Sequence, residues 1–206
     1  MDKQKTHIFD VDDTLVPCRW LKYVNAYLEK TGQKTYEQHE ITSPFFFCDT
    51  VFPTPEKMQG FLDFFLQYDS YKDMKPIEGA VDCLRKLSEA DRVLYSTKVV
   101  PQFKVDPEYN LRFAATEFPQ KLRWLMTHFP FIPPTHMNIT GQKDIIHGHS
   151  LIEDNFNYLE VNENNFKKKL LHTTHHNKGL SKQELDRIGA IRVNTFQQIE
   201  EHLLHQ

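Results

Sequence analysis

The sequence of 206 residues is poor in cysteine and carries little net charge. Its three cysteines, Cys18, Cys48 and Cys83, have no metal-ligand spacing and make no even disulfide set, so we expect reduced thiols in a cytoplasmic protein. The formal net charge of −3 provides no strong field for nucleic acid or for an anionic membrane surface. We therefore expect neither of them as a partner.

Long apolar runs, internal repeats and low-complexity tracts are also missing. No apolar stretch approaches the roughly 20 residues that a membrane-spanning helix needs. A strand is expected as early as Thr6, which leaves no room for a signal peptide before it. Apolar residues still make up 39% of the chain, with 16 phenylalanines, which is enough for one packed domain or for a core with an insertion.

Strand-like and helix-like segments alternate along most of the chain. This alternation predicts an α/β fold with a parallel sheet covered by helices on both faces. The predicted strands are Thr6–Phe9, Arg92–Thr97, His136–Thr140, Ser150–Asp154, Leu170–Thr173 and Ala190–Val193. The predicted helices are Trp20–Lys30, Glu56–Tyr68, Gly79–Ala90, Phe118–His128 and Phe196–Leu204. Residues 16–75 interrupt the alternation, because two helical stretches there flank a segment rich in proline and phenylalanine.

Acidic residues follow two of the predicted strands. Asp10 and Asp12 come at the end of the first strand, with Thr14 two positions further on, and Glu153 and Asp154 end a later strand. In an open parallel sheet, ligands bind at the carboxyl ends of the strands. Carboxylates gathered there repel one another, so we expect a divalent cation such as Mg²⁺, which takes oxygen ligands.

The segment Asp10-x-Asp12-x-Thr14 after an N-terminal strand resembles the first motif of the haloacid dehalogenase-like (HAD) superfamily, a Rossmann-like fold. Most members are Mg²⁺-dependent phosphatases. The resemblance implies that Asp10 is the nucleophile and Asp12 the general acid and base. It also implies metal ligation by the Asp10 carboxylate, the Asp12 carbonyl and Asp154, with Glu153 acting through water or orienting its neighbours. Which of Glu153 and Asp154 touches the metal stays open.

The same resemblance implies a hydroxyl and a lysine that bind the phosphoryl group. The hydroxyl belongs to Ser96 or Thr97 at the end of the second core strand, and the sequence does not separate the two. For the lysine we favour Lys121, because it lies between the second and fourth motifs. Ranked behind it are Lys98, Lys104 and Lys143.

A narrower resemblance, to the 5′(3′)-deoxyribonucleotidase family, spans about residues 5–205. It rests on Gln120–Pro130, Lys143–Ile146 and Leu151–Asn155. It implies hydrolysis of (deoxy)nucleoside monophosphates by a core of residues 1–15 and 76–206, with a small helical cap at 16–75. Phe45, Phe46, Phe47 and Phe52 then either form the core of the cap or stack on a base.

Several alternatives remain at this point. A phosphatase for a sugar phosphate or another small metabolite would use the same chemistry, and a non-catalytic binding protein could keep the fold. We interpret His172, His175 and His176 as surface or loop residues rather than zinc ligands, since no cysteine accompanies them. The expected partner is a small phosphomonoester, and a homodimer is left open.

Overall fold

The computed structural model describes residues 4–98, 103, 105–140 and 143–205. Six parallel strands form one sheet in the order β3-β2-β1-β4-β5-β6. Their bounds are Thr6–Phe9 (β1), Arg92–Thr97 (β2), Met137–Ile139 (β3), Gly148–Glu153 (β4), Phe166–His172 (β5) and Ala190–Val193 (β6). This confirms the predicted α/β class and the parallel sheet.

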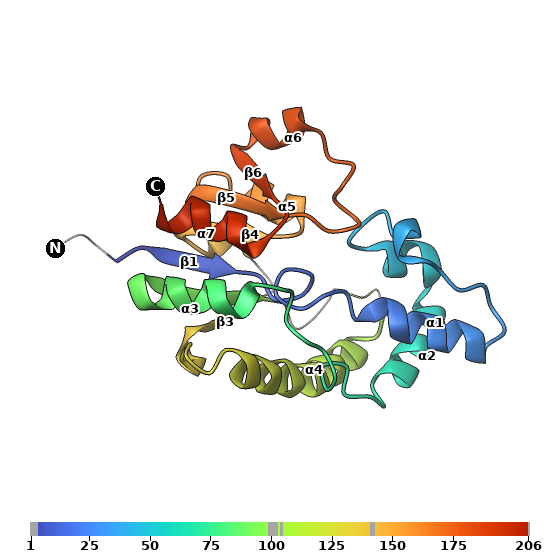
Figure 1. The fold of residues 1–206 in the computed structure, drawn as a ribbon. Coiled ribbons are helices and arrows are strands. Elements are labelled where there is room, and N and C mark those ends of the chain that lie inside the picture. The colour runs from blue at the N-terminus through green and yellow to red at the C-terminus, as the bar shows by residue number, and fades with distance from the viewer. Residues whose placement is uncertain (1–3, 99–102, 104, 141–142, 206) are drawn as a thin grey trace.

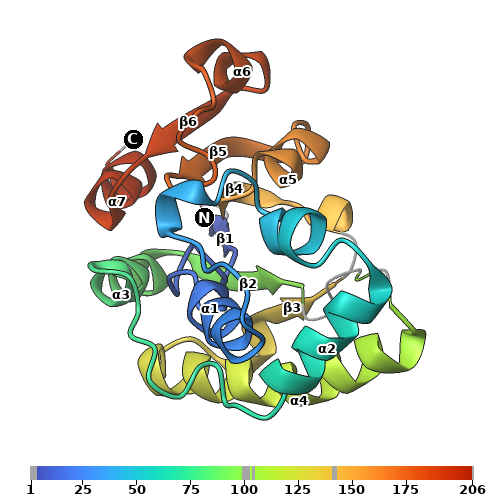
Figure 2. The same ribbon diagram turned by 90° about the vertical axis from the view of Figure 1, so that its right-hand side faces the viewer.

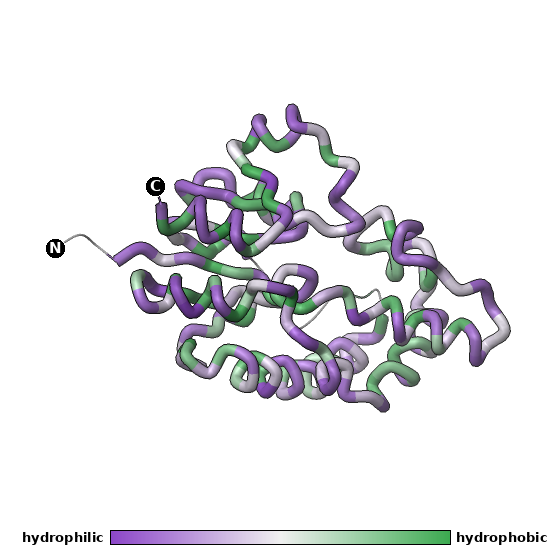
Figure 3. Tube along the Cα trace, in the orientation of Figure 1, coloured by the Kyte–Doolittle hydropathy of each residue, from purple (hydrophilic) through white to green (hydrophobic). Residues whose placement is uncertain are grey.

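Helices cover both faces of the sheet (Figures 1 and 2). Phe9, Ile152 and Leu170 pack in one cluster with helices α3 (Ala80–Ala90), α4 (Pro107–His128) and α7 (Phe196–Leu204). The adjacent residues Ile8, Leu151 and Leu171 pack in another cluster with α5 (Phe156–Val161) and α6 (Lys182–Arg187). Because successive strand residues point to opposite faces, the two clusters lie on either side of the sheet. Hydrophobic and hydrophilic residues alternate along the helices, as expected for elements with one apolar face (Figure 3).

A third hydrophobic cluster lies beyond the carboxyl ends of the strands. It joins α1 (Trp20–Lys30), the π-helical turn Phe47–Val51 and α2 (Pro55–Phe65). Phe103 and Phe113, which lie outside residues 16–75, belong to the same cluster. The apolar residues of the insertion are therefore covered in part by the first half of α4.

The main difference from the predicted elements is the length of α4. The helix was expected to begin at Phe118, but it begins at Pro107 and continues through Pro119. Asp106 caps it by accepting a hydrogen bond from the Glu108 N–H at 2.8 Å. The first half of the helix is held by packing of Phe113 in the third cluster, which compensates for the backbone donor that Pro119 lacks.

No helix among the described residues is both long and apolar enough to cross a membrane.

Candidate active site

Three carboxylates meet at the carboxyl ends of β1 and β4. These strands pair in register, and the Asp10 N–H donates to the Ile152 carbonyl at 2.9 Å. This pairing brings Asp10 beside Glu153 and Asp154, and one carboxylate oxygen of each lies within 4.8 Å of the others. All three side chains are buried. A buried set of oxygen donors fits a hard cation such as Mg²⁺, which would also offset their mutual repulsion.

A buried lysine joins two of these carboxylates. Lys143 Nζ lies 2.5 Å from Asp10 Oδ1 and 2.8 Å from Glu153 Oε2. Burial, and the charge of Glu153, raise the pKa of Asp10 to about 7, although Lys143 opposes this shift. Burial likewise raises the pKa of Glu153 to about 7, again against the effect of Lys143. Burial alone would lower the pKa of Lys143, but the two carboxylates outweigh it and raise that pKa.

Asp12 is held by three other side chains. Lys121 Nζ lies 2.5 Å from Oδ2, the Tyr71 hydroxyl donates to Oδ1 at 2.6 Å, and Arg19 Nε lies 3.4 Å from Oδ1. Burial would raise the pKa of Asp12, but the charges of Lys121 and Arg19 outweigh it and lower that pKa. Arg19 is fixed in turn by Glu117, with Nη1 and Oε2 2.6 Å apart. In this arrangement Asp12 is a carboxylate with both oxygens engaged.

The two candidate hydroxyls, Ser96 and Thr97, are both buried but differ in their position relative to the cavity. Thr97, the last residue of β2, lines the cavity above the sheet, and its Oγ1 lies 2.6 Å from Lys121 Nζ. Ser96 is buried, is not among the residues that line this cavity, and has no hydrogen-bond partner for its Oγ among the described residues. Thr97 is therefore the hydroxyl that a ligand in the cavity could contact.

The candidate lysines occupy different places. Lys121 and Lys143 both reach the carboxylates, but only Lys143 contacts Asp10. The Nζ of Lys98 lies 4.9 Å from the ring centroid of Tyr158. Lys104 lies outside the described residues. Lys143, in the short turn Lys143–Ile145, also lies between the second and fourth motifs, so position along the sequence could not separate it from Lys121.

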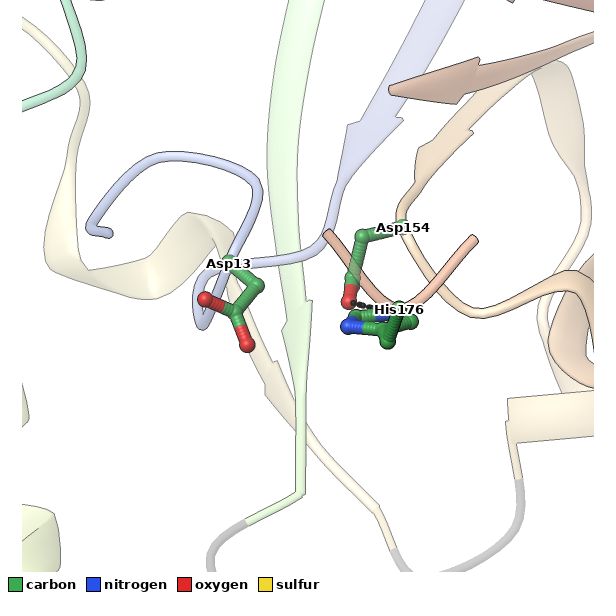
Figure 4. A group of neighbouring side chains, drawn as sticks. All are labelled: Asp13, Asp154 and His176. Atoms are coloured by element: carbon green, nitrogen blue, oxygen red, sulfur yellow. Dashed lines mark ion pairs between the residues drawn. The ribbon is translucent and has the colours of Figure 1, made fainter. Parts of the chain in front are cut away.

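The interpretation of the histidines as surface or loop residues is wrong for His172 and holds for His175 and His176, which lie in a turn, although the His176 side chain is buried against the acidic site. His172 ends β5 and is 4% exposed, and its Nδ1 lies 3.2 Å from the carbonyl of Asp13. The side chain of His176 is 3% exposed, and its Nε2 lies 3.0 Å from Asp154 Oδ2 (Figure 4). The loop after β5 folds back onto the acidic site, where an amide of Asn177 donates to the Asp154 carbonyl. His175 contacts Gln38 and packs edge-on against the His176 ring, with ring centroids 5.3 Å apart.

The carboxylates open into a cavity of about 610 Å³. Its polar end holds Asp10, Asp12 and Lys143. Its other end is apolar and is lined by the exposed ring of Phe45 and by side chains of the third cluster, among them Trp20, Ile41, Phe47, Phe52, Met58, Phe61, Phe103 and Phe113. Of the aromatic residues singled out in the sequence, Phe46 is buried in the cluster and does not line the cavity. The site therefore suits a ligand with an anionic group and a flat apolar group.

Known proteins match this chain over most of its length. The model of the family described as "5′ nucleotidase, deoxy (Pyrimidine), cytosolic type C protein" matches residues 6–204. The 5′(3′)-deoxyribonucleotidase of Bacillus subtilis is 29% identical over 139 residues, which are 68% of each protein. A Staphylococcus epidermidis protein is 32% identical over 116 residues, and this match covers 53% of the chain but only 62% of that relative.

Solved structures agree with the fold. A hydrolase from Pseudomonas syringae has a TM-score of 0.58 at 16% identity, with 98% of both chains covered. A HAD family hydrolase from Deinococcus radiodurans, with bound phosphate and sodium, has a TM-score of 0.50 at 15% identity, with 98% of this chain and 96% of that chain covered. These likenesses confirm the HAD-like fold. Because the family model matches almost the whole sequence, the chain belongs to the cytosolic type C 5′(deoxy)nucleotidase family.

Proposed function

We propose that this chain is a Mg²⁺-dependent phosphatase that hydrolyses (deoxy)nucleoside monophosphates through an aspartyl-phosphate on Asp10. The observation that carries the proposal is the cavity, which places Asp10 and Lys143 at one end and Phe45, Phe47 and Phe52 at the other. A phosphate fits the cationic and hydroxyl groups of the first end. A base ring fits the second, because stacking on an aromatic side chain stabilises a bound base by about 1–3 kcal/mol.

In the first step a carboxylate oxygen of Asp10 attacks phosphorus, and the ester bond between phosphorus and the nucleoside oxygen breaks. Asp12 gives its proton to the leaving oxygen. Asp12 must gain a proton beforehand, and an incoming dianion favours this, because it competes for the charges of Lys121 and Arg19 that now hold Asp12 ionised. In the second step Asp12 takes a proton from water, the water oxygen bonds to phosphorus, and the bond to Asp10 breaks. Free phosphate leaves and the Asp10 carboxylate is restored.

Asp10, Asp154 and the carbonyl of Asp12 would hold the magnesium ion, with Glu153 paired to Lys143 behind them. When bound, magnesium supplies charge neutralisation for the phosphoryl oxygens. Thr97 and Lys121 bind the same oxygens from the β2 side. Lys143 favours the ionised form of Asp10 against the effect of burial and holds its oxygen in place for attack.

We further propose that residues 16–75 act as a cap on a core of residues 1–15 and 76–206. Support comes from the position of α1 and α2, which lie beyond the carboxyl ends of the strands (Figure 1). The apolar end of the cavity is lined mainly by this segment. A cap of this kind would exclude water from the aspartyl-phosphate and would set the choice of substrate.

The test is phosphate release by the purified protein with Mg²⁺, measured on 5′- and 3′-nucleoside monophosphates, sugar phosphates and p-nitrophenyl phosphate. We expect nucleoside monophosphates to be preferred, chelation to abolish the activity, and added Mg²⁺ to restore it. Asp10→Asn is the control and should lower turnover by about 10³-fold or more, since it removes the nucleophile.

Each other outcome has a distinct meaning. Release of phosphate only from other esters would support the proposed chemistry and contradict the proposed substrate class. Activity that survives chelation would overturn the metal, and substantial activity of Asp10→Asn would overturn the nucleophile. No release from any ester would favour a binding protein instead.

A further inference from the structure

A second group of possible metal ligands lies beside the acidic site. Ligand atoms of Asp13, Asp154 and His176 all lie within 4.8 Å of one another. They come from three separate segments: the turn after β1, the end of β4 and the loop after β5 (Figure 4). Asp154 belongs also to the oxygen set with Asp10 and Glu153, whereas Asp13 and His176 do not. The second set therefore differs from the first in containing a nitrogen donor.

The three side chains differ in how firmly they are held. Asp154 and His176 are 8% and 3% exposed and lie 3.0 Å apart, a separation close to the roughly 3.3 Å between ligand atoms of a tetrahedral zinc site. The Asp13 carboxylate accepts no hydrogen bond and forms no ion pair in the part of the chain that the structure describes. A cation bound by Asp13 would therefore displace no protein partner among the described residues.

The surroundings of the group are those of a metal ligand set. Both ring nitrogens of His176 lie 3.2 Å from the Thr174 hydroxyl, which helps to hold the ring beside Asp154. A contact between His172 Nδ1 and the carbonyl of Asp13 holds the backbone of this residue in place. All three candidate ligands line the large cavity, which gives an ion a path from solvent.

The charge balance also calls for a cation. Lys143 and Lys121 are already paired with other carboxylates. No basic side chain among the described residues forms an ion pair with Asp13, so a bound cation would offset the charges of Asp13 and Asp154, which lie close together.

We propose that Asp13, Asp154 and His176 form a second divalent-cation site that takes zinc in preference to magnesium. An imidazole nitrogen with two carboxylates suits zinc, whereas magnesium favours oxygen ligands alone. The site shares Asp154 with the proposed magnesium centre. It rests on the donor geometry and not on the proposed reaction.

The test is calorimetric titration of zinc into the full-length protein, without substrate and in excess magnesium, so that the oxygen-only set is occupied. We expect the wild type to bind one zinc ion per chain tightly. His176→Gln and Asp13→Asn should each weaken this binding at least 10-fold. Asn tolerates the left-handed backbone of Asp13, where φ is 58°, so the second substitution removes charge without forcing the turn to change.

The matched control is His205→Gln, which alters an exposed imidazole just after α7 that is not among the residues lining the cavity. This variant should bind zinc as the wild type does. Equal weakening by His205→Gln, or no effect of His176→Gln and Asp13→Asn, would overturn the site, as would the absence of tight zinc binding to the wild type. Thermal unfolding of each variant establishes that the chain is folded. Phosphate release with magnesium alone is a separate measurement, so failure of the zinc site and failure of the proposed reaction are distinguishable.

Discussion

Two buried lysines contact different acidic residues of the site. Lys143 lies between Asp10 and Glu153, and Lys121 lies between Asp12 and Thr97. Both ammonium groups are almost completely buried, so each is there only because its partners compensate for lost solvation. The division gives each lysine a different part in the proposed reaction: one acts on the nucleophile and the other on the acid.

This division can be tested with Lys143→Met and Lys121→Met. Lys143→Met should lower turnover about 10²–10³-fold on nucleoside monophosphates and on p-nitrophenyl phosphate alike, because it affects Asp10. Lys121→Met should lower turnover more on nucleoside monophosphates than on p-nitrophenyl phosphate, because a nitrophenolate leaves without needing a proton from Asp12. Steady-state kinetics on both substrates gives the two ratios. The same ratio for both variants would contradict separate roles.

The sequence predicted the residues that follow strands and missed those in loops. Asp10, Glu153 and Asp154 come together because parallel strands bring their carboxyl ends to one edge, so strand prediction was enough to bring them together. Arg19 and His176 lie in segments without strand structure, and the way these segments fold back brings the two side chains to the site. No periodic pattern marks such residues, and their roles depend on contacts between segments far apart in the sequence.

The third cluster is the element-scale feature on which the apolar end of the cavity depends. Trp20 of α1 stacks on Phe65 of α2 with ring centroids 4.7 Å apart and an angle of 4°. Phe65 also lies 6.0 Å from Phe113 of α4, in a stacked arrangement. These rings connect the insertion to the helix that carries Lys121, so packing in the cluster also positions the site.

Phe65→Ala should therefore lower the free energy of unfolding by about 3–5 kcal/mol, since it leaves a cavity at a fully buried position. Phe45→Ala is the matched control. Its side chain is 46% exposed, so it should lower this free energy by less than about 1 kcal/mol. Urea unfolding followed by circular dichroism measures both. A similar loss for the two variants would contradict the packing described here.

Helices and strands with a clear and regular apolar pattern were predicted more accurately than short elements. The helix Trp20–Lys30 and the strands Thr6–Phe9 and Arg92–Thr97 were predicted with the observed bounds, because their apolar spacing is clear. The helices α5 and α6 have six residues each, too few to show a helical period. The early start of α4 depends on tertiary packing of Phe113, which local sequence does not report.

At the scale of the whole molecule, a buried polar group lies at the amino ends of the strands, away from the acidic site. His7 of β1 is fully buried, with Nδ1 2.7 Å from Ser150 Oγ and Nε2 3.2 Å from Asp91 Oδ2. Burial lowers the pKa of His7, against the opposing effect of Asp91. The positive charges of Lys5 and Lys168 lower the pKa of His7 further, and His149 also faces His7.

This arrangement makes stability depend on pH. The unfolded chain binds a proton at His7 below about pH 6.5, whereas the folded chain resists it, so the contribution is present above pH 6.5 and is lost as the pH falls. We expect the free energy of unfolding of wild type to fall more steeply between pH 7.5 and pH 5.5 than that of His7→Gln, by at most about 1.4 kcal/mol per pH unit. Urea unfolding at the two pH values measures the difference. Parallel pH profiles would contradict this role of His7.

The contacts that hold Asp12 have a consequence for turnover. Arg19 lies near the start of the insertion and Tyr71 near its end, and both reach the same oxygen of Asp12. Any movement of the insertion away from the sheet must release this oxygen or pull Asp12 along with it. In the proposed reaction, in which Asp12 is the proton donor, opening of the cavity and release of Asp12 would therefore be coupled. Admission of a substrate would then also free Asp12 to take up the proton that it must donate.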